Sequence, residues 1–412
     1  MGAGYDPGMP TEIALIGISA AVLLSYWYSH LARVLRLPAV IFLLTTGIVL
    51  REVLTRQGVN EPLPPGLLPL VGTIGLILIV LEGALDLDLH PGRRAFLLRT
   101  FGAAGFGVFL CTAVIGAALH FVFNLAWLPA LLLATPFAVI SSAVAIPSAE
   151  VLEGETREFV VYESSWSDIL GVMVFNALLV TATDTGGAVG NFVGGGLTVL
   201  VIGSAVGLAM VWLVSHLEGH VKFLPLIFAL LLVYGGAKAL HLSPLLIVLI
   251  LGLLLNNPHL IRHVKKLQGL YSPHYGQELD KLKHLTAEAT FLVRTFFFLM
   301  LGYNTDLATF ADWQTWAVAI GAVALIFGLR VPVLWLLGIR PVRPLLWASP
   351  RGLITVLLFY SLPEQFVPAA FPRGALILVV LLSCVVMAFG LLRDGKAKAE
   401  PSDAEAKAEL SP

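Results

Sequence analysis

Long apolar stretches constrain the fold of this chain more than any other feature of its sequence. A membrane-spanning helix needs about 20 mostly apolar residues, and thirteen stretches approach or meet that length. The bilayer core holds no water to bond backbone N–H and C=O groups. A single segment that crosses it therefore forms a helix, in which these groups bond each other. Only 12% of the residues are charged, against about 25% in soluble domains. We therefore predict an all-α polytopic membrane protein with spans at 11–32, 37–54, 67–89, 96–122, 125–150, 157–182, 191–216, 223–240, 243–257, 285–304, 313–338, 345–362 and 374–393.

The loop charges predict the orientation of these spans. With the N-terminus outside, eighteen of the 25 lysines and arginines lie in inner loops or the C-terminal tail, and four lie in outer loops. Basic residues concentrate on the cytoplasmic side, so we expect a multi-pass protein of the cell (inner) membrane with a cytoplasmic C-terminus. Residues 1–10 are then a short outer tail, 11–393 the transmembrane domain, and the polar residues 394–412 a disordered tail.

Other features exclude some classes of function. No run of basic residues is interleaved with aromatic residues, so nucleic-acid binding is not expected. Cys111 and Cys384 lie in apolar segments, which argues against a disulfide framework or a cysteine metal site, and no cofactor is predicted. His259 and His263, in the connection 258–284, have a spacing that suits a metal ion or a pH sensor. The alternative is a surface helix with solvated histidines, because no third ligand is evident.

Two predicted spans contain helix-breaking sequences. They are residues 140–147 in the fifth span and residues 348–352 in the twelfth. Proline removes a backbone donor, and the polar groups that it frees are tolerated at membrane depth where they line a cavity. The breaks lie seven spans apart, as expected if spans 1–6 and 8–13 form two inverted repeats. Paired breaks in corresponding halves point to a transport site, and ordinary proline kinks are the alternative.

Two carboxylates lie inside the span 157–182. Charges at membrane depth are costly and usually mark an ion or proton path, although a structural ion pair is the alternative. At about 100° per residue, Asp168 shares a helix face with Ser164, whereas Glu163 points roughly 140° away. At about 1.5 Å per residue, Asp168 lies near the middle of the bilayer, where carboxylate and hydroxyl oxygens suit a hard cation. Glu82 is a weaker candidate, with a polar packing contact as its alternative.

Three arginines also lie inside spans. Arg330 matches Glu163 in depth and opposes it in charge, which predicts a structural ion pair between two helices. Arg294 lies near the depth of Asp168. Arg351 lies in the second break, where a cation suits the carbonyl-rich ends of interrupted helices.

At these residues the chain resembles the monovalent cation/proton antiporters, in particular the electroneutral sodium/proton exchangers. The resemblance covers nearly all thirteen spans, and its motifs are residues 163–168, 328–331, 350–352 and 141–146. The first is similar to the family's Glu-Ser-x-x-Asn-Asp motif, with Ser167 in place of asparagine. The last is similar to its Thr-Asp-Pro-Val-Ala-Val segment, with Ser142 and Ala143 in place of Asp-Pro.

The resemblance implies the sodium/proton antiporter fold, with two inverted repeats and discontinuous crossing helices. It also implies that Asp168 binds the transported ion, that Glu163 pairs with Arg330, and that core helices move against the dimerisation helices of a homodimer. The predicted cation and proton site is Asp168 with Ser141, Ser142, Ser164 and Ser167, and Arg294 and Arg351 are the predicted charge compensation at the broken helices.

These features predict a secondary transporter that exchanges Na⁺, or alternatively Li⁺ or K⁺, for H⁺ by alternating access around Asp168. A passive cation channel and a cation-coupled symporter of the same architecture are alternatives. A membrane-embedded enzyme would use Ser164 or Ser165 as its nucleophile, with Glu163 or a histidine as base. No histidine lies inside spans four to six or ten to twelve unless His120, at the edge of span four, is counted, so an enzyme is not predicted.

The predicted exchange is electroneutral, with one cation for one proton. Electrogenic relatives of this fold carry a second aspartate beside the first and a lysine on another core helix. Here Ser167 precedes Asp168, and the basic residues at depth are arginines, which keep their proton in proteins.

Overall fold

Every regular element in the described part of the chain is helical. This computed structural model describes residues 11–35, 37–58, 64, 66–89, 91–183, 188–216, 223–239, 244–259, 274–340 and 342–399. The long helices are α1 (Thr11–Leu35), α2 (Ala39–Arg56), α3 (Leu67–Asp86), α4 (Arg94–Phe123), α7 (Gly154–Thr183), α8 (Ala188–His216), α9 (Phe223–Ala239), α10 (Pro244–Asn256), α12 (Tyr275–Tyr303), α13 (Trp313–Leu336) and α16 (Gly374–Ala399). Shorter helices form two pairs, α5 (Trp127–Ala138) with α6 (Ser142–Ser148) and α14 (Val342–Trp347) with α15 (Leu353–Tyr360). Single 3-10 turns are η1 (Pro91–Arg93), η2 (Ala149–Val151), η4 (Leu307–Phe310) and η5 (Glu364–Phe366).

Each predicted span corresponds to one helix or to one interrupted pair. Nine helical segments among the described residues are long and apolar enough to cross a membrane. Of the remaining spans, α2 carries three charged residues near its end, α9 and α10 are shorter, and α14 with α15 is interrupted. The predicted all-α polytopic fold with discontinuous helices is confirmed.

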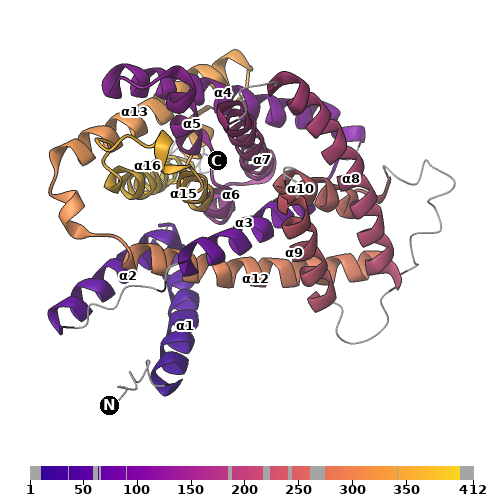
Figure 1. Ribbon diagram of the computed structural model, residues 1–412, viewed down its shortest axis with the longest axis horizontal. Helices are drawn as coiled ribbons and strands as arrows, with labels where there is room; N and C mark the ends of the chain where they lie inside the picture. Colours follow the sequence, from indigo (N-terminus) through magenta and orange to yellow (C-terminus); the bar gives the residue numbers. More distant parts are fainter. Residues whose placement is uncertain are drawn as a thin grey trace, which may run out of the picture.

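The helices pack in two groups, as Figure 1 shows. We call α4–α7 and α13–α16 the core group, in which α4 packs on α5, α7 and α13, and α16 packs on α13 and α14. We call α1–α3, α8–α10 and α12 the α12 group, in which α12 packs on α2 and α3, and α10 packs on α8, α3 and α9. Helix α3 also touches α7 and α15, so it joins the two groups.

Glycines fix the closest contact within the α12 group. A Cβ atom added to Gly47 of α2 would lie 2.2 Å from the Leu299 carbonyl oxygen, and one added to Gly302 of α12 would lie 2.3 Å from the Leu44 carbonyl oxygen. Small residues allow such close backbone approach between membrane helices. Helices α2 and α12 therefore form a tightly interlocked pair.

Three boundaries differ from the sequence expectation. Helix α12 begins at Tyr275, before the predicted span start at 285, and helix α16 continues to Ala399, past the predicted tail boundary at 394. The first break is shorter than the predicted segment 140–147: it lies at residues 139–141, and Pro147 is inside α6. The predicted outer tail 1–10, residues 400–412 of the predicted inner tail, and His263 lie outside the described residues.

Candidate functional site

The two interrupted spans meet at their breaks. Residues 139–141 separate α5 from α6, and residues 348–352 separate α14 from α15. The backbone N–H of Ser141 donates to the carbonyl oxygen of Pro350 at 3.0 Å, so the two breaks are hydrogen-bonded to each other. A Cβ atom at Gly352 would lie 2.6 Å from Ser141 Oγ. The crossing therefore requires glycine at this position.

Polar side chains bond the backbone groups that the first break frees. The Ile140 N–H donates to Ser167 Oγ at 2.9 Å. Arg351 Nε donates to the Phe137 carbonyl at 2.6 Å, and a terminal nitrogen of the same guanidinium donates to the Ala138 carbonyl at 3.2 Å. These carbonyls end α5 and have no donor within the helix, and the negative end of a helix favours a cation. Arg351 thus lies where the sequence predicts charge compensation.

Asp168 of α7 lies against the start of α6. One carboxylate oxygen, Oδ2, accepts hydrogen bonds from the Ser142 hydroxyl and from the Ser142 backbone N–H at 3.2 Å. The other oxygen, Oδ1, is buried without a protein partner, and so is the hydroxyl oxygen of the neighbouring Ser141. Buried polar atoms are nearly always hydrogen-bonded. The two unpartnered oxygens belong to a residue of the first break and to a residue that contacts the start of α6.

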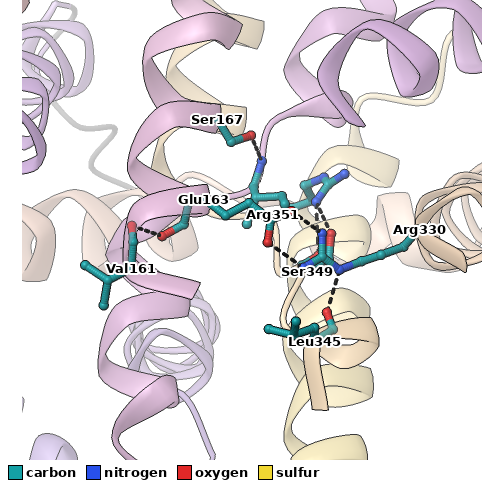
Figure 2. A network of polar contacts seen from close by, with 9 residues as sticks. Val161, Glu163, Ser167, Arg330, Leu345, Ser349 and Arg351 are labelled. Carbon is teal, nitrogen blue, oxygen red and sulfur yellow. Dashed lines mark hydrogen bonds and ion pairs between the residues drawn. The ribbon is translucent and has the colours of Figure 1, made fainter. Parts of the chain in front are cut away.

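Glu163 and Arg330 form a buried ion pair between α7 and α13. Both terminal nitrogens of Arg330 donate to the Glu163 carboxylate, at 2.9 and 2.8 Å, as Figure 2 shows. Arg330 Nε donates to the Leu345 carbonyl of α14 at 2.6 Å. This planar two-point contact is the strong form of an arginine–carboxylate pair, and it ties α7, α13 and α14 together.

Arg294 reaches the first turn of α6 from α12. One terminal nitrogen donates to the Ala143 carbonyl at 2.6 Å, while its Nε is buried without a partner. Glu82 lies on α3, which packs directly on α12, and an ionised Glu82 attracts the Arg294 guanidinium.

A cavity of about 720 Å³ lies between the two groups of helices. Its walls come from α1, α2 and α12 on one side and from α6 and α16 on the other, and they include Ala143, Ser148, Glu150, His284, Glu288 and Arg294. Ala143 follows Ser142 directly. The cavity therefore ends within one residue of the side chain that holds Asp168.

Some predicted residues are not brought to Asp168. The Ser164 and Ser165 hydroxyls both donate to the Val161 carbonyl of their own helix, at 3.2 and 2.9 Å. Ser167 turns to the first break, as described above. His259 lies 3.2 Å from the Leu89 carbonyl, and the described residues contain no group of three or more metal-ligating side chains suited to a metal ion.

The sequence can now be compared with known families. Residues 19–392 match the family model for the transmembrane part of sodium/hydrogen exchangers. The chain belongs to the sodium/hydrogen exchanger family. Members of this family are membrane transporters, so the predicted classification as a sodium/proton exchanger is confirmed.

Solved structures agree with this family assignment. A structure at pH 8 of the sodium/proton antiporter MjNhaP1 from Methanocaldococcus jannaschii is 20% identical in sequence, with a TM-score of 0.68. The match covers 93% of this chain and 99% of that one. An electron-microscopy map of the same antiporter gives 18% identity, a TM-score of 0.69, and coverage of 93% and 98%. The exchanger described here therefore has the sodium/proton antiporter fold.

Some contacts in this exchanger were not foreseen from its sequence. The Arg351 N–H donates to Ser383 Oγ of α16 at 2.9 Å, and Arg294 bonds to Ala143. A signal for the second contact exists, because Pro147 lies four residues after Ala143 and leaves that carbonyl without its helical donor. No comparable signal marks Ser383, which lies in an apolar helix.

Proposed function

We propose that this chain exchanges a monovalent cation, with Na⁺ as the first candidate, for H⁺, and that Asp168 binds the two in turn. The observation that supports this most directly is the pair of buried, unpartnered oxygens, Asp168 Oδ1 and Ser141 Oγ. Carboxylate and hydroxyl oxygens are the ligands that hard cations prefer. The family assignment and the name of the similar antiporter point to the same two ions.

One carboxylate is sufficient for exchange because the proton and the cation compete for it. When Asp168 is ionised, Ser142 stabilises Oδ2 with two hydrogen bonds, and a cation bound at Oδ1 compensates the buried charge. When Asp168 is protonated, the side chain is neutral and needs no cation. An empty, ionised site is the costly form at membrane depth, so the site moves only when it is loaded with one ion or the other.

The cavity supplies one of the two access routes in this proposal. Its exposed lining residues Glu150, His284 and Glu288 lie at the predicted cytoplasmic ends of their spans, with the N-terminus outside the cell membrane. Movement of the core group against the α12 group would close this route and open the opposite one. We assign the α12 group to the contact between two copies in a homodimer.

Transport in sealed vesicles tests the proposal. Purified protein is reconstituted into liposomes with an acidic lumen and a pH-sensitive dye, and Na⁺, Li⁺ or K⁺ is added outside. The native protein should release the proton gradient when the cation is added, because inward cation movement drives protons out. Asp168→Asn should abolish this response while keeping the native elution profile and thermal unfolding. The amide has no charge to compensate a bound cation, and it does not take up a proton in exchange.

Matched controls separate the competing outcomes. Ser164→Ala should keep the native response, because the Ser164 hydroxyl bonds only within its own helix. Native-like activity of Asp168→Asn would overturn the assignment of Asp168. An imposed cation gradient that fails to move protons uphill would indicate a channel, and proton movement in the same direction as the cation would indicate a symporter.

A further inference from the structure

The carbonyl of Ala143 lacks its helical hydrogen-bond donor because of a proline, and it accepts a hydrogen bond from an arginine of the opposite group of helices. In a regular helix the N–H of residue 147 would donate to the carbonyl of residue 143, but Pro147 has no N–H. Arg294 of α12 fills that gap at 2.6 Å. This hydrogen bond carries a full charge, and such bonds are stronger than neutral ones.

The bond spans the cavity between the two groups of helices. Arg294 is fixed to the α12 group, because α12 interlocks with α2 at Gly47 and Gly302. Ala143 is fixed to the core group, because α6 packs on α7. Both residues line the cavity. Any movement of α6 relative to α12 therefore has to break or stretch this bond.

The α12 group also carries a carboxylate, Glu82 of α3. Helices α3 and α12 pack directly on each other, so an ionised Glu82 attracts the Arg294 guanidinium. The Arg294 Nε–H is buried without an acceptor, so the guanidinium is incompletely bonded in the conformation seen here. When the Ala143 carbonyl moves away, the buried Arg294 guanidinium can therefore turn to the Glu82 carboxylate instead.

We propose that Arg294 is a positioning residue that latches α6, and with it Ser142, to the α12 group in the cavity-open conformation, and that Glu82 receives the guanidinium when the latch opens. This inference deepens the proposed exchange and rests on it in one respect, namely that α6 moves during transport. Glu82 and Arg294 then have opposite effects on the cavity-open conformation. Arg294 stabilises the cavity-open conformation, whereas Glu82 competes with the Ala143 carbonyl for the Arg294 guanidinium.

Thiol accessibility in the cavity measures this equilibrium without any ion gradient. Ser148 of α6 lines the cavity, and the native Cys111 and Cys384 are buried. Ser148→Cys is therefore introduced, the protein is placed in nanodiscs, and the rate of labelling by an uncharged, water-soluble maleimide is followed. Arg294→Gln should slow labelling, by about tenfold or more for the loss of one charged hydrogen bond. Arg294→Lys, which keeps a charged donor, should give an intermediate rate.

Replacing Glu82 is expected to change the labelling rate in the opposite direction to replacing Arg294. This difference distinguishes a latch from a merely structural pair. Glu82→Gln should label at the native rate or faster, because the competing acceptor has lost its charge. Glu288→Gln is the control, because Glu288 lines the same cavity and lies on α12, the helix that carries Arg294. This substitution should leave the labelling rate unchanged. A native labelling rate for both Arg294→Gln and Arg294→Lys would overturn the latch. Slow labelling of Glu82→Gln, equal to that of Arg294→Gln, would overturn it as well.

The test also separates the latch from the proposed exchange. Labelling is repeated in Asp168→Asn, in which transport is expected to be absent. The same ranking of rates in that background supports the latch whatever the vesicle assay shows. Failure of cation-driven proton release in the native protein, with the ranking of labelling rates intact, would overturn the exchange alone.

Discussion

Three serines near Asp168 have different bonding, and each is expected to respond differently to replacement. The Ser141 hydroxyl is buried without a partner, the Ser142 hydroxyl donates to Asp168, and the Ser167 hydroxyl accepts from the first break. A hydroxyl with no internal bond costs little stability to remove, but a cation would lose a ligand. The bonding pattern therefore separates a ligand from a structural residue.

We predict that Ser141→Ala raises the KM for the cation several-fold and leaves thermal unfolding nearly unchanged. Ser167→Ala is the contrasting variant, because it leaves the buried Ile140 N–H without an acceptor and should cost about 1–3 kcal/mol of stability. Dequenching assays at graded cation concentration and thermal scans measure both quantities. An unchanged KM in Ser141→Ala would remove Ser141 from the cation site.

Between elements, the Glu163–Arg330 pair joins α7 to α13 in the core group. Both side chains are buried, with 1% and 4% exposure. Removing one partner leaves an uncompensated buried charge, so Glu163→Ala and Arg330→Ala should each destabilise by about 3–5 kcal/mol. The double variant should cost less than the sum of the two, because it leaves neither charge behind.

A double-mutant cycle on thermal stability measures this coupling. The exposed pair Glu52 and Arg56 on α2 is the matched control, because exposed ion pairs contribute little. Strict additivity for Glu163 and Arg330 would contradict the prediction that the two side chains stabilise each other.

The crossing of the two breaks depends on a glycine. Gly352→Ala would place a methyl group 2.6 Å from Ser141 Oγ and 2.8 Å from Val144 Cγ2. We predict a loss of about 1–3 kcal/mol of stability from this overpacking, together with strongly reduced exchange. Gly321→Ala in α13 is the control, since no heavy atom lies within 4 Å of its added Cβ. Full activity of Gly352→Ala would show that the breaks can separate without harm to transport.

Sequence patterns predict some of these elements well. The second break lies where the sequence placed it, because proline and glycine act locally on the backbone at 348–352. The approximate depth of Glu163 and Arg330 follows from a fixed rise per residue, and the two side chains do meet. These are properties of single helices, which the order of residues along the chain specifies.

The features that could not be predicted from the sequence depend on contacts between segments that are distant along the chain. The first break is confined to 139–141, at the start of the predicted segment 140–147, because Ser167 and Arg351 bond the backbone groups freed there. Helical periodicity places Ser164 on the face of Asp168, yet it does not say which segment that face meets. The segment that meets Asp168 is the start of α6, and its hydroxyl comes from Ser142.

For the whole molecule, we infer the stoichiometry of the proposed exchange from the charges inside the membrane. At the crossing, Asp168 is the carboxylate that contacts α6, whereas Glu163 is fully used by Arg330. Arginine keeps its proton in proteins, so Arg294, Arg330 and Arg351 supply none for exchange. A single titrating carboxylate carries either one proton or one monovalent cation. The loaded site therefore has the same charge in both directions of transport.

We accordingly predict electroneutral exchange, with a rate and an end point that do not respond to membrane voltage. The measurement uses proteoliposomes clamped at different voltages with potassium and valinomycin, with Na⁺ or Li⁺ as the substrate. The native protein should give the same rate at every clamped voltage, and liposomes without protein correct for proton leak. A voltage-dependent rate or end point would contradict one-for-one exchange, because it requires a second titrating group on the path. Glu82 would then be the first residue to replace, since it lies on α3, which packs directly on the helix that carries Arg294, and restoration of voltage independence in Glu82→Gln would identify it as that group.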